Sequence, residues 1–300
     1  MANPTIDARR SAAMILAGMM TLGLSDNFVP FITEAGSLWQ FHLIRGGLAV
    51  ALFAVLGLLG FARFWPRRFW RVLARNVFTA GAMLLYFGCL AFLPIGVVVA
   101  GLFTAPLFVL MISAIVQRRR VGPVRWAAVV VGFLGALMVI RPDPDNLDVV
   151  AFLPIVAGLL YAIGAVATRA WCEGEGTVAM SAVFFALLAI FGTVGCLVLP
   201  QGGALGAEGF VVRGWMPLTG NMVFWYAVQA VGALIGIAFI FGGYQSGEAS
   251  YVAIFEYSLL IFASFWAWIL WQQEVPPMAM LGMALIFAAG AVIALRSEAG

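Results

Sequence analysis

Three ionisable side chains stand inside long apolar stretches, and they are the residues best placed to do chemistry. Asp26 lies in LSDNFVP, Arg45 in WQFHLIRGG and Glu256 in AIFEYSLL. A charge inside membrane hydrocarbon costs about 2.5–3.5 kcal/mol and is usually paired or turned toward a cavity. We therefore expect these three residues to lie at a site that handles a polar solute.

Each of these charges has a structural and a functional interpretation. Asp26 and Arg45 are predicted at equal depth below the outer ends of their helices, so they can form a salt bridge. They can equally form a charged wall that meets a carboxylate or ammonium group. His42 shares the helix face of Arg45 and is either an interfacial polar contact or a proton relay. Glu256 either lines the cavity or makes a packing hydrogen bond.

Other residues add to the candidate cavity. Asn27 lies in DNFVP and Pro106 in FTAP. Proline lacks an N–H and frees backbone groups, and such breaks in a membrane helix are tolerated where they are buried or line a cavity. Aromatic residues deep in the apolar stretches either line the cavity with polar tips or pack in the core. They are Tyr86, Phe103, Tyr161, Tyr251, Phe255 and Tyr257.

The usual components of an enzyme site are scarce. The chain has one histidine and three cysteines, Cys89, Cys172 and Cys196, whose spacing matches no metal motif. It also lacks a Walker motif, so ATP is not the direct energy source. We expect no catalytic residue, no metal and no cofactor, and we interpret the cysteines as small packing residues.

The elements that must hold these residues are membrane helices. Of 300 residues 64% are hydrophobic and 10% charged, against about 45–50% and about 25% in soluble domains. Apolar stretches near the ~20 residues needed to cross hydrocarbon recur along the chain and lack the alternation of a β-barrel. Ten spans are predicted, at 11–31, 38–60, 72–93, 96–117, 124–140, 149–169, 178–199, 217–242, 248–271 and 276–295.

Arginine placement predicts the orientation. Loops on one side hold Arg9, Arg10, Arg63, Arg67, Arg68, Arg71, Arg75, Arg118, Arg119, Arg120, Arg125, Arg169 and Arg296. The opposite loops hold only Arg141 and Arg213. Because cytoplasmic loops are rich in positive charge, we expect both termini in the cytoplasm of a bacterial inner membrane. The acidic linker at 143–148 is then outside, and the arginines are no sign of nucleic-acid binding.

The chain repeats itself. LFTAPLFVLMIS (102–113) leads to GFLGALMVI (132–140), and AIFEYSLLIFAS (253–264) leads to FAAGAVIAL (287–295). The arginine-rich QRRRVGPVRW (117–126) corresponds to WQQEVPPMAM (271–280), which has no arginine. Opposite charge flanks around similar segments are typical of inverted repeats. We predict an all-α polytopic membrane protein in which 1–146 and 147–300 are two inverted five-helix repeats.

The segments 84–140 and 242–270 resemble the EamA-type transporters of the drug/metabolite transporter superfamily. Bacterial exporters of aromatic and other amino acids, of the YddG type, are the nearest comparison. The resemblance covers essentially the whole chain and implies two EamA domains of five helices each. It also implies that the helix carrying Glu256 lines the cavity. This family often has Glu-Pro in that helix, whereas here Tyr257 follows Glu256, which puts a proline hinge in doubt.

These features favour a secondary carrier over a channel or a membrane-embedded enzyme. We expect alternating access to a central cavity between the halves, with the lipid bilayer and a small-molecule substrate as partners and a monomer as the working unit. Glu256 or Asp26 is the expected proton carrier if protons drive transport. The resemblance favours amino-acid export. The alternatives are uptake or export of S-adenosylmethionine, riboflavin or a drug-like cation.

Overall fold

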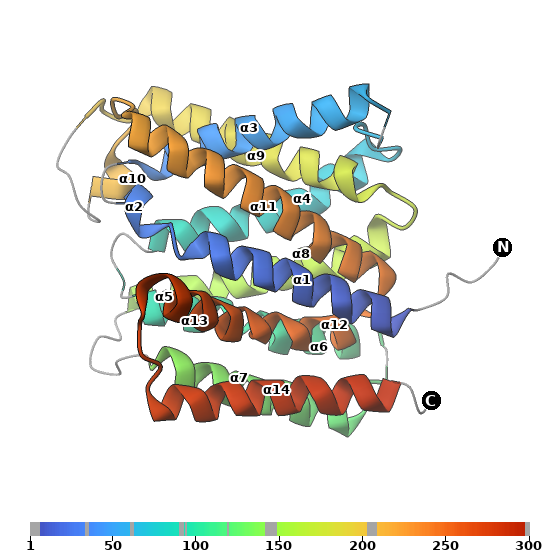
Figure 1. The fold of residues 1–300 in the computed structure, drawn as a ribbon. Coiled ribbons are helices and arrows are strands. Elements are labelled where there is room, and N and C mark those ends of the chain that lie inside the picture. The colour runs from blue at the N-terminus through green and yellow to red at the C-terminus, as the bar shows by residue number, and fades with distance from the viewer. Residues whose placement is uncertain are drawn as a thin grey trace.

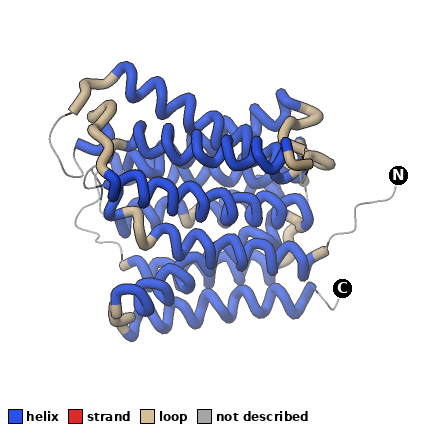
Figure 2. The backbone as a smooth tube through the Cα atoms, turned by 45° about the horizontal axis from the view of Figure 1, so that its top comes forward, coloured by secondary structure: helices blue, strands red, loops and turns tan. Residues whose placement is uncertain are grey.

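The structure is a computed structural model that describes residues 7–33, 36–60, 63–89, 93, 95–118, 120–141, 149–202 and 209–297. Within these ranges it is helical and contains no strand (Figure 2). The predicted linker at 143–148 lies outside the described residues. In chain order the elements are α1 (Ala8–Asp26), α2 (Pro30–Thr33), α3 (Leu38–Leu58), α4 (Phe69–Cys89), α5 (Ile95–Leu102), α6 (Ala105–Ile115), α7 (Pro123–Ile140), η2 (Val149–Phe152), α8 (Leu153–Trp171), α9 (Thr177–Val198), α10 (Gly209–Val212), α11 (Gly220–Ser246), α12 (Ala249–Val252), η3 (Ala253–Tyr257), α13 (Ser258–Trp271) and α14 (Pro277–Ser297).

Eight helical stretches in the described residues are long and apolar enough to cross a membrane. They match the second to ninth predicted spans to within a few residues at each end. The first and tenth predicted spans coincide with α1 and α14, which are not among the eight. The start of α1 and the end of α14 lie at the same end of the bundle (Figure 1).

The first predicted span is not one continuous helix. The helix α1 ends at Asp26, and after a turn that contains Asn27 the chain continues as α2. Proline at position 30 cannot donate the hydrogen bond that a continuous helix would send to the carbonyl of Asp26. The side-chain amide of Asn27 instead donates to the carbonyl of Gly23 at 2.7 Å. Asp26 is therefore the last residue of a helix, whereas the sequence placed it several residues inside one.

Two other spans are also interrupted. The fourth predicted span divides at Phe103 and Thr104 into α5 and α6. The ninth passes from α12 through the tighter helix η3 before it continues as α13. Short 3₁₀ stretches inside longer helices often mark functional positions, and Glu256 lies in this one.

Long antiparallel contacts between helices distant in sequence build the bundle. The most extensive packing joins α3 with α9, α1 with α11, α7 with α14, and α4 with α8. Small residues allow close approach of membrane helices, and the glycines of α11 do so here. A β-carbon at Gly236 would lie 2.6 Å from the side chain of Leu22 on α1.

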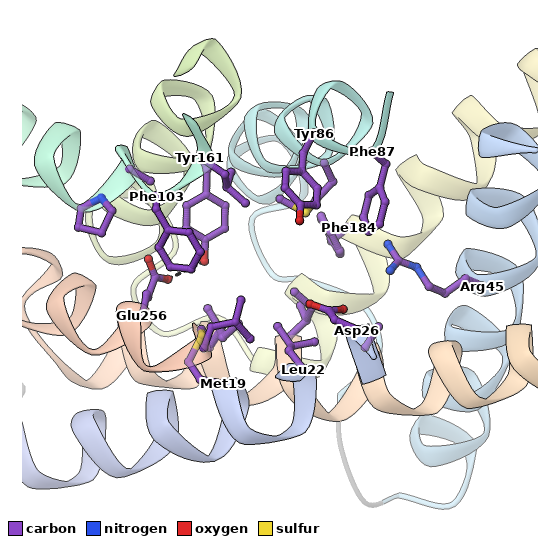
Figure 3. Close-up of a pocket in the computed structure, with 18 residues that line it drawn as sticks. Met19, Leu22, Asp26, Arg45, Tyr86, Phe87, Phe103, Tyr161, Phe184 and Glu256 are labelled. Carbon is purple, nitrogen blue, oxygen red and sulfur yellow. Dashed lines mark hydrogen bonds between the residues drawn. The ribbon is translucent and has the colours of Figure 1, made fainter. Parts of the chain in front are cut away.

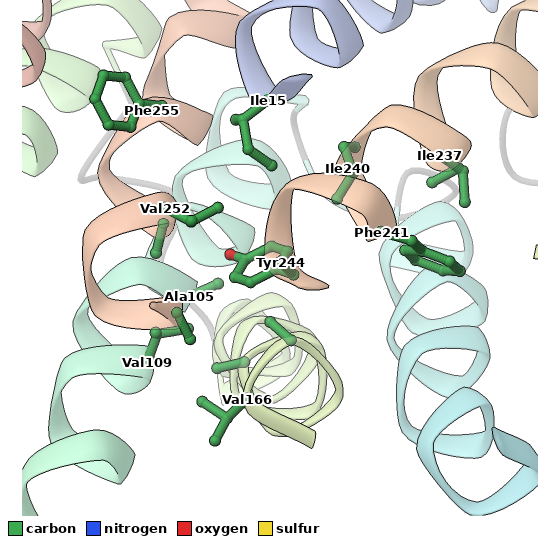
Figure 4. Packing of buried hydrophobic residues seen from close by; sticks show 14 of the residues in the cluster. Ile15, Ala105, Val109, Val166, Ile237, Ile240, Phe241, Tyr244, Val252 and Phe255 are labelled. Carbon is green, nitrogen blue, oxygen red and sulfur yellow. The ribbon is translucent and has the colours of Figure 1, made fainter. Parts of the chain in front are cut away.

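The bundle is apolar both inside and outside. Its main core gathers aliphatic and aromatic side chains from α1, α6, α8, α11 and α12, among them Ile15, Val109, Val166 and Phe241 (Figure 4). The outer surface carries Leu58 and Leu197, whose side chains are 88% and 78% exposed. Apolar exposure on this scale suits a lipid environment. The chain is thus an all-helical, multi-pass membrane protein.

Two arginines that the sequence assigned to loops are buried. Arg75 is the seventh residue of α4 and is 2% exposed, and Arg213 is 1% exposed. Arg213 donates to the carbonyl of Gly36 at 2.6 Å and so fixes the segment after α10 over the start of α3. Both were counted with the loops between the predicted spans, a count that says nothing of burial, and both guanidinium groups find polar partners within the fold.

At the opposite end of the bundle, a carboxylate ties two loops together. The amides of Arg67 and Arg68, just before α4, donate to the Oε2 and Oε1 atoms of Glu175 at 2.8 and 2.6 Å. Glu175 lies between α8 and α9 and is buried. It therefore joins loops that are more than a hundred residues apart in sequence.

Replacing Glu175 by glutamine is expected to lower the free energy of unfolding by about 1–3 kcal/mol. An amide offers only one acceptor oxygen, so one of the two backbone N–H groups loses its partner. Thermal unfolding in detergent measures the effect, and Glu173→Gln, an exposed glutamate in the same loop, is the control. Equal melting temperatures for the two variants would contradict the assigned role of Glu175.

Candidate functional site

A pocket lies at the centre of the bundle and encloses about 830 Å³ of space free of protein atoms, its open side included. Ligand pockets are mainly apolar with a few polar groups, and this one has that character. Its lining comes from both predicted halves. It consists of Met19, Leu22, Asp26, Arg45, Met83, Tyr86, Phe87, Leu102, Phe103, Ala105, Pro106, Tyr161, Phe184, Ala233, Ile237, Ile240, Glu256 and Leu259.

One end of the pocket carries an acid and a base that face each other. Figure 3 shows Asp26 and Arg45 on either side of the space, with Tyr86 and Phe87 beside them. Asp26 is exposed although it lies within the bundle, because it borders the pocket. The guanidinium of Arg45 stacks over Phe41, 4.4 Å from the ring centroid, and over Phe87 at 5.3 Å.

The predicted ion pair between Asp26 and Arg45 is not formed as a direct contact. The ion pair observed among the described residues joins Arg125 to Glu248 at 2.6 Å. Arg45 is instead held by the faces of two aromatic rings, which attract cations, and Asp26 ends α1 across the pocket. Both charges are therefore available to a solute between them.

The other end of the pocket holds a second acid. Glu256 is 6% exposed and accepts a hydrogen bond from the hydroxyl of Tyr161 at 2.6 Å. Phe103 lies next to this pair, and Met19 lies on the adjoining wall (Figure 3). Two of the three interrupted spans thus reach this end, the fourth through Phe103 and the ninth through Glu256. Discontinuous helices at mid-bundle are typical of substrate and ion sites in transporters.

Seven of the twelve residues that the sequence proposed line this pocket. They are Asp26, Arg45, Tyr86, Phe103, Pro106, Tyr161 and Glu256. The other five are Asn27, His42, Tyr251, Phe255 and Tyr257, and they do not line it. Whether a residue lines the pocket depends on which face of its helix it occupies, since residues on one helix point in different directions.

The excluded residues have packing positions instead. Asn27 bonds to the carbonyl of Ala263 at 3.2 Å and ties α1 to α13. Tyr257 stacks on Phe103 from behind, with ring centroids 5.7 Å apart. His42 is fully buried, and its ring contacts those of Phe41 and Phe87.

Buried positions also account for Tyr251 and Phe255. Both side chains are buried, and their ring centroids lie 5.2 Å apart. They belong to the main hydrophobic core. Of the two alternatives that the sequence left open for them, cavity lining and core packing, these positions correspond to core packing.

Most of the apolar lining was not identified from the sequence. Met19, Leu22 and Asp26 lie at positions i, i+3 and i+7 of α1, and this spacing places them on one helix face. A search of the sequence for residues on the same helix face as Asp26 would have identified Met19 and Leu22. Phe184 and Ile237 carry no comparable signal, because their helices are apolar on every side.

The fold and this pocket define a multi-pass membrane protein with a central, largely apolar cavity that carries charges at both ends. No group of three or more His, Cys, Asp or Glu side chains in the described residues is arranged to hold a metal ion. The arrangement suits reversible binding of a solute.

The chain is similar to proteins known as transporters. The riboflavin transporter of Rhizobium johnstonii is 27% identical over 243 residues, which cover 81% of this chain and 74% of the relative. The riboflavin transporter of Vibrio cholerae is 25% identical over 280 residues, covering 89% and 88%. The pseudopaline exporter CntI of Pseudomonas aeruginosa is 25% identical over 221 residues, covering 73% and 72%.

The fold itself has been observed in a solved crystal structure. That chain superimposes with a TM-score of 0.73 at 17% sequence identity, and the match covers 98% of this chain and 97% of the other. No family model matches this chain. The resemblance to EamA-type transporters therefore stays a prediction, while similarity to small-molecule transporters of the membrane is established.

Proposed function

We propose that this protein is a secondary transporter that moves a small amphipathic metabolite across the bacterial inner membrane by alternating access. The observation that carries the proposal is the central pocket, which is lined from both halves of the chain and charged at both ends. Binding near the middle of the bundle, between repeats, is how many secondary transporters work. The transporter relatives support the same conclusion.

The helix packing supports two inverted five-helix halves, 1–146 and 147–300. In that scheme α3 corresponds to α9 and α7 to α14, and each of these helices packs extensively against its own counterpart. In the same scheme α1 corresponds to α8 and α11 corresponds to α4. The contact between α1 and α11 therefore corresponds to the contact between α8 and α4, and both pairs pack extensively. A two-fold relation between the halves accounts for all four contacts.

The ten-span assignment follows from the same scheme. It counts α1 and α14 as spans, joins α5 to α6, and joins α12, η3 and α13. An even number of crossings agrees with the placement of the start of α1 and the end of α14 at one end of the bundle (Figure 1). Arginine placement makes that end cytoplasmic, so the Asp26 end of the pocket faces outward.

Riboflavin is the first substrate to test. Its flat ring system and polar chain match a pocket with aromatic walls and polar ends, and two relatives are riboflavin transporters. Amino-acid export is the second candidate, because Asp26 and Arg45 face each other and can meet an ammonium and a carboxylate group. Both candidate substrates would use the same pocket, and a competition experiment, in which excess amino acids are added during riboflavin uptake, distinguishes them.

Proteoliposomes that contain the protein are expected to accumulate riboflavin in a saturable manner and to exchange it with riboflavin outside. The fluorescence of the vitamin inside washed vesicles measures uptake, with and without a pH gradient. Amino acids added in excess should leave uptake unchanged if riboflavin is the substrate. Non-saturable flux would instead indicate a channel.

A matched pair of tryptophan variants locates the path. Leu259 lines the pocket, whereas Leu270 on the same helix is 38% exposed at the surface. Leu259→Trp is expected to block uptake by filling the pocket, and Leu270→Trp to leave it unchanged. Equal uptake by both variants would show that the solute does not pass through this pocket.

A further inference from the structure

His42 is a buried polar side chain whose hydrogen-bonding groups are unused. Its side chain is fully buried, and neither ring nitrogen makes a hydrogen bond with any residue in the described ranges. A neutral imidazole carries one N–H donor and one acceptor nitrogen. Burying both without partners costs free energy that an apolar ring of the same shape would not cost. Packing alone therefore does not explain a histidine at this position.

The ring of Phe87 separates His42 from the pocket. Phe87 lines the pocket, whereas His42 does not. The two rings meet edge to face, with centroids 5.4 Å apart and an interplanar angle of 79°. Phe87 thus contacts the pocket on one side and the imidazole on another. A rotation of this one side chain would bring the imidazole to the pocket.

The helix face that carries His42 already borders the pocket. Arg45 lies one turn further along α3, on the same face, and it lines the pocket. A different face of α3 packs on α9, where Trp39 and Leu43 closely approach Gly192. The wall that Arg45 begins therefore continues to His42 behind Phe87. In the proposed orientation, this continuation extends the pocket toward its outer end.

The contacts that hold Phe87 include one that a bound solute would weaken. The guanidinium of Arg45 lies 5.3 Å from the centroid of the Phe87 ring, and Figure 3 shows both side chains at the same end of the pocket. A solute that accepts hydrogen bonds from Arg45 draws the cation away from the ring face that attracts it. Rotamer changes of this kind are common on binding. Binding at Arg45 thus favours rotation of Phe87.

We propose that His42 is a specificity-determining residue of the transport site, which rotation of Phe87 uncovers so that its ring bonds to a hydroxyl group of the solute. A hydroxyl both donates and accepts, as the two imidazole nitrogens together do, whereas an ammonium group only donates and a carboxylate only accepts. The solute class is therefore a flat or apolar body with a hydroxylated chain. This inference rests on the proposed transport function and deepens it, since the chain of riboflavin carries several hydroxyl groups.

Chemical modification tests whether Phe87 covers His42. Diethyl pyrocarbonate reacts with accessible imidazole, and His42 is the single histidine of the chain, so mass spectrometry of the purified, untagged protein in detergent identifies its reaction. Phe87→Leu is expected to speed the modification several-fold, and riboflavin to slow it in both proteins. A rate that neither the substitution nor riboflavin changes would overturn the inference.

Phe53→Leu is the matched control for this measurement. Phe53 is also a buried phenylalanine and lies on α3 itself, but its ring contacts Phe185. The substitution removes the same atoms as Phe87→Leu does, so it should leave the modification rate of His42 unchanged. An equal acceleration by Phe53→Leu and Phe87→Leu would show a general loosening of the bundle and would overturn the assignment of Phe87 as the cover.

Flavin fluorescence in detergent tests the contact with the hydroxyl group. Lumiflavin has the ring system of riboflavin without the hydroxylated chain. We expect native protein to bind riboflavin about tenfold or more tightly than lumiflavin, because a site that bonds to a hydroxyl rejects an analogue without it. His42→Phe should bind both flavins with similar affinity, and His42→Gln, whose amide donates and accepts, should keep part of the difference. An unchanged affinity ratio in His42→Phe would overturn the inference.

Thermal unfolding and uptake separate this inference from the proposed function. His42→Phe should melt at the native temperature or higher, because it removes two unpaired polar groups. A lower melting temperature would show that the imidazole has a structural role and would overturn the inference. Riboflavin binding that depends on His42, without uptake into proteoliposomes, would defeat the transport function alone. Uptake with equal preference for the two flavins in native protein and His42→Phe would defeat the inference alone.

Discussion

Replacing Arg45 by glutamine is expected to lower riboflavin uptake by about tenfold or more, which corresponds to the loss of about 1.4 kcal/mol of interaction. Arg45 supplies the cation among the residues that line the pocket. Its guanidinium is already oriented by Phe41 and Phe87, so a solute that accepts hydrogen bonds meets a preformed donor. Glutamine fills similar space without the charge or the forked geometry.

The partner across the pocket provides the second half of this test. Asp26→Asn should lower uptake as well, and Arg45→Lys should retain more activity than Arg45→Gln. Arg10→Gln, a change of an exposed arginine at the start of α1, is the matched control. If both Asp26→Asn and Arg45→Gln transport normally in vesicles, the two charges are not part of the binding wall.

Replacing Gly192 by alanine is expected to be among the most destabilising single changes in the bundle. A β-carbon at this position would lie 2.4 Å from the backbone nitrogen of Leu43 and 2.5 Å from the carbonyl oxygen of Trp39, both on α3. Backbone atoms cannot rotate away as a side chain can, so α3 and α9 would have to separate. We expect a loss of about 1–3 kcal/mol in the free energy of unfolding.

Gly47→Ala provides the matched comparison. Gly47 also lies within a helix, α3, but a β-carbon there would have no neighbour within 4 Å. Alanine has a higher helix propensity than glycine by about 1 kcal/mol, so this variant should be neutral or slightly stabilised. A melting temperature for Gly192→Ala equal to that of Gly47→Ala would show that the contact between α3 and α9 is looser than described.

The positions of the helices could be predicted closely from the sequence. Eight predicted spans coincide with apolar helices, and α1 and α14 occupy the two remaining ranges. This success has a simple cause, since a membrane allows few structures and demands lengths near 20 apolar residues. Hydropathy alone gave one continuous span over 11–31, whereas the proline in DNFVP indicated a break there, and α1 ends at Asp26.

The charged residues of the pocket could also be found, because a charge in an apolar stretch is conspicuous. Asp26, Arg45 and Glu256 all line the pocket. Arg75 was not recognised as a buried charge, because it lies near a helix start among exposed arginines and looks like one of them. Its burial depends on α8 and α11, which approach it from more than eighty residues away in sequence.

The sequence by itself determined the helices, the apolar surface and the few charges that must be explained. The tertiary structure alone decided which side chains share the pocket, why Tyr161 points into it while Tyr257 does not, and that Asp26 and Arg45 face each other without touching. The physical reason is that a helix with apolar side chains all around it has no polar face in its sequence, so its rotation about its own axis cannot be predicted from the sequence. Rotation is set by close contacts between helices, such as that of Gly192 with α3, and these form only when the bundle packs.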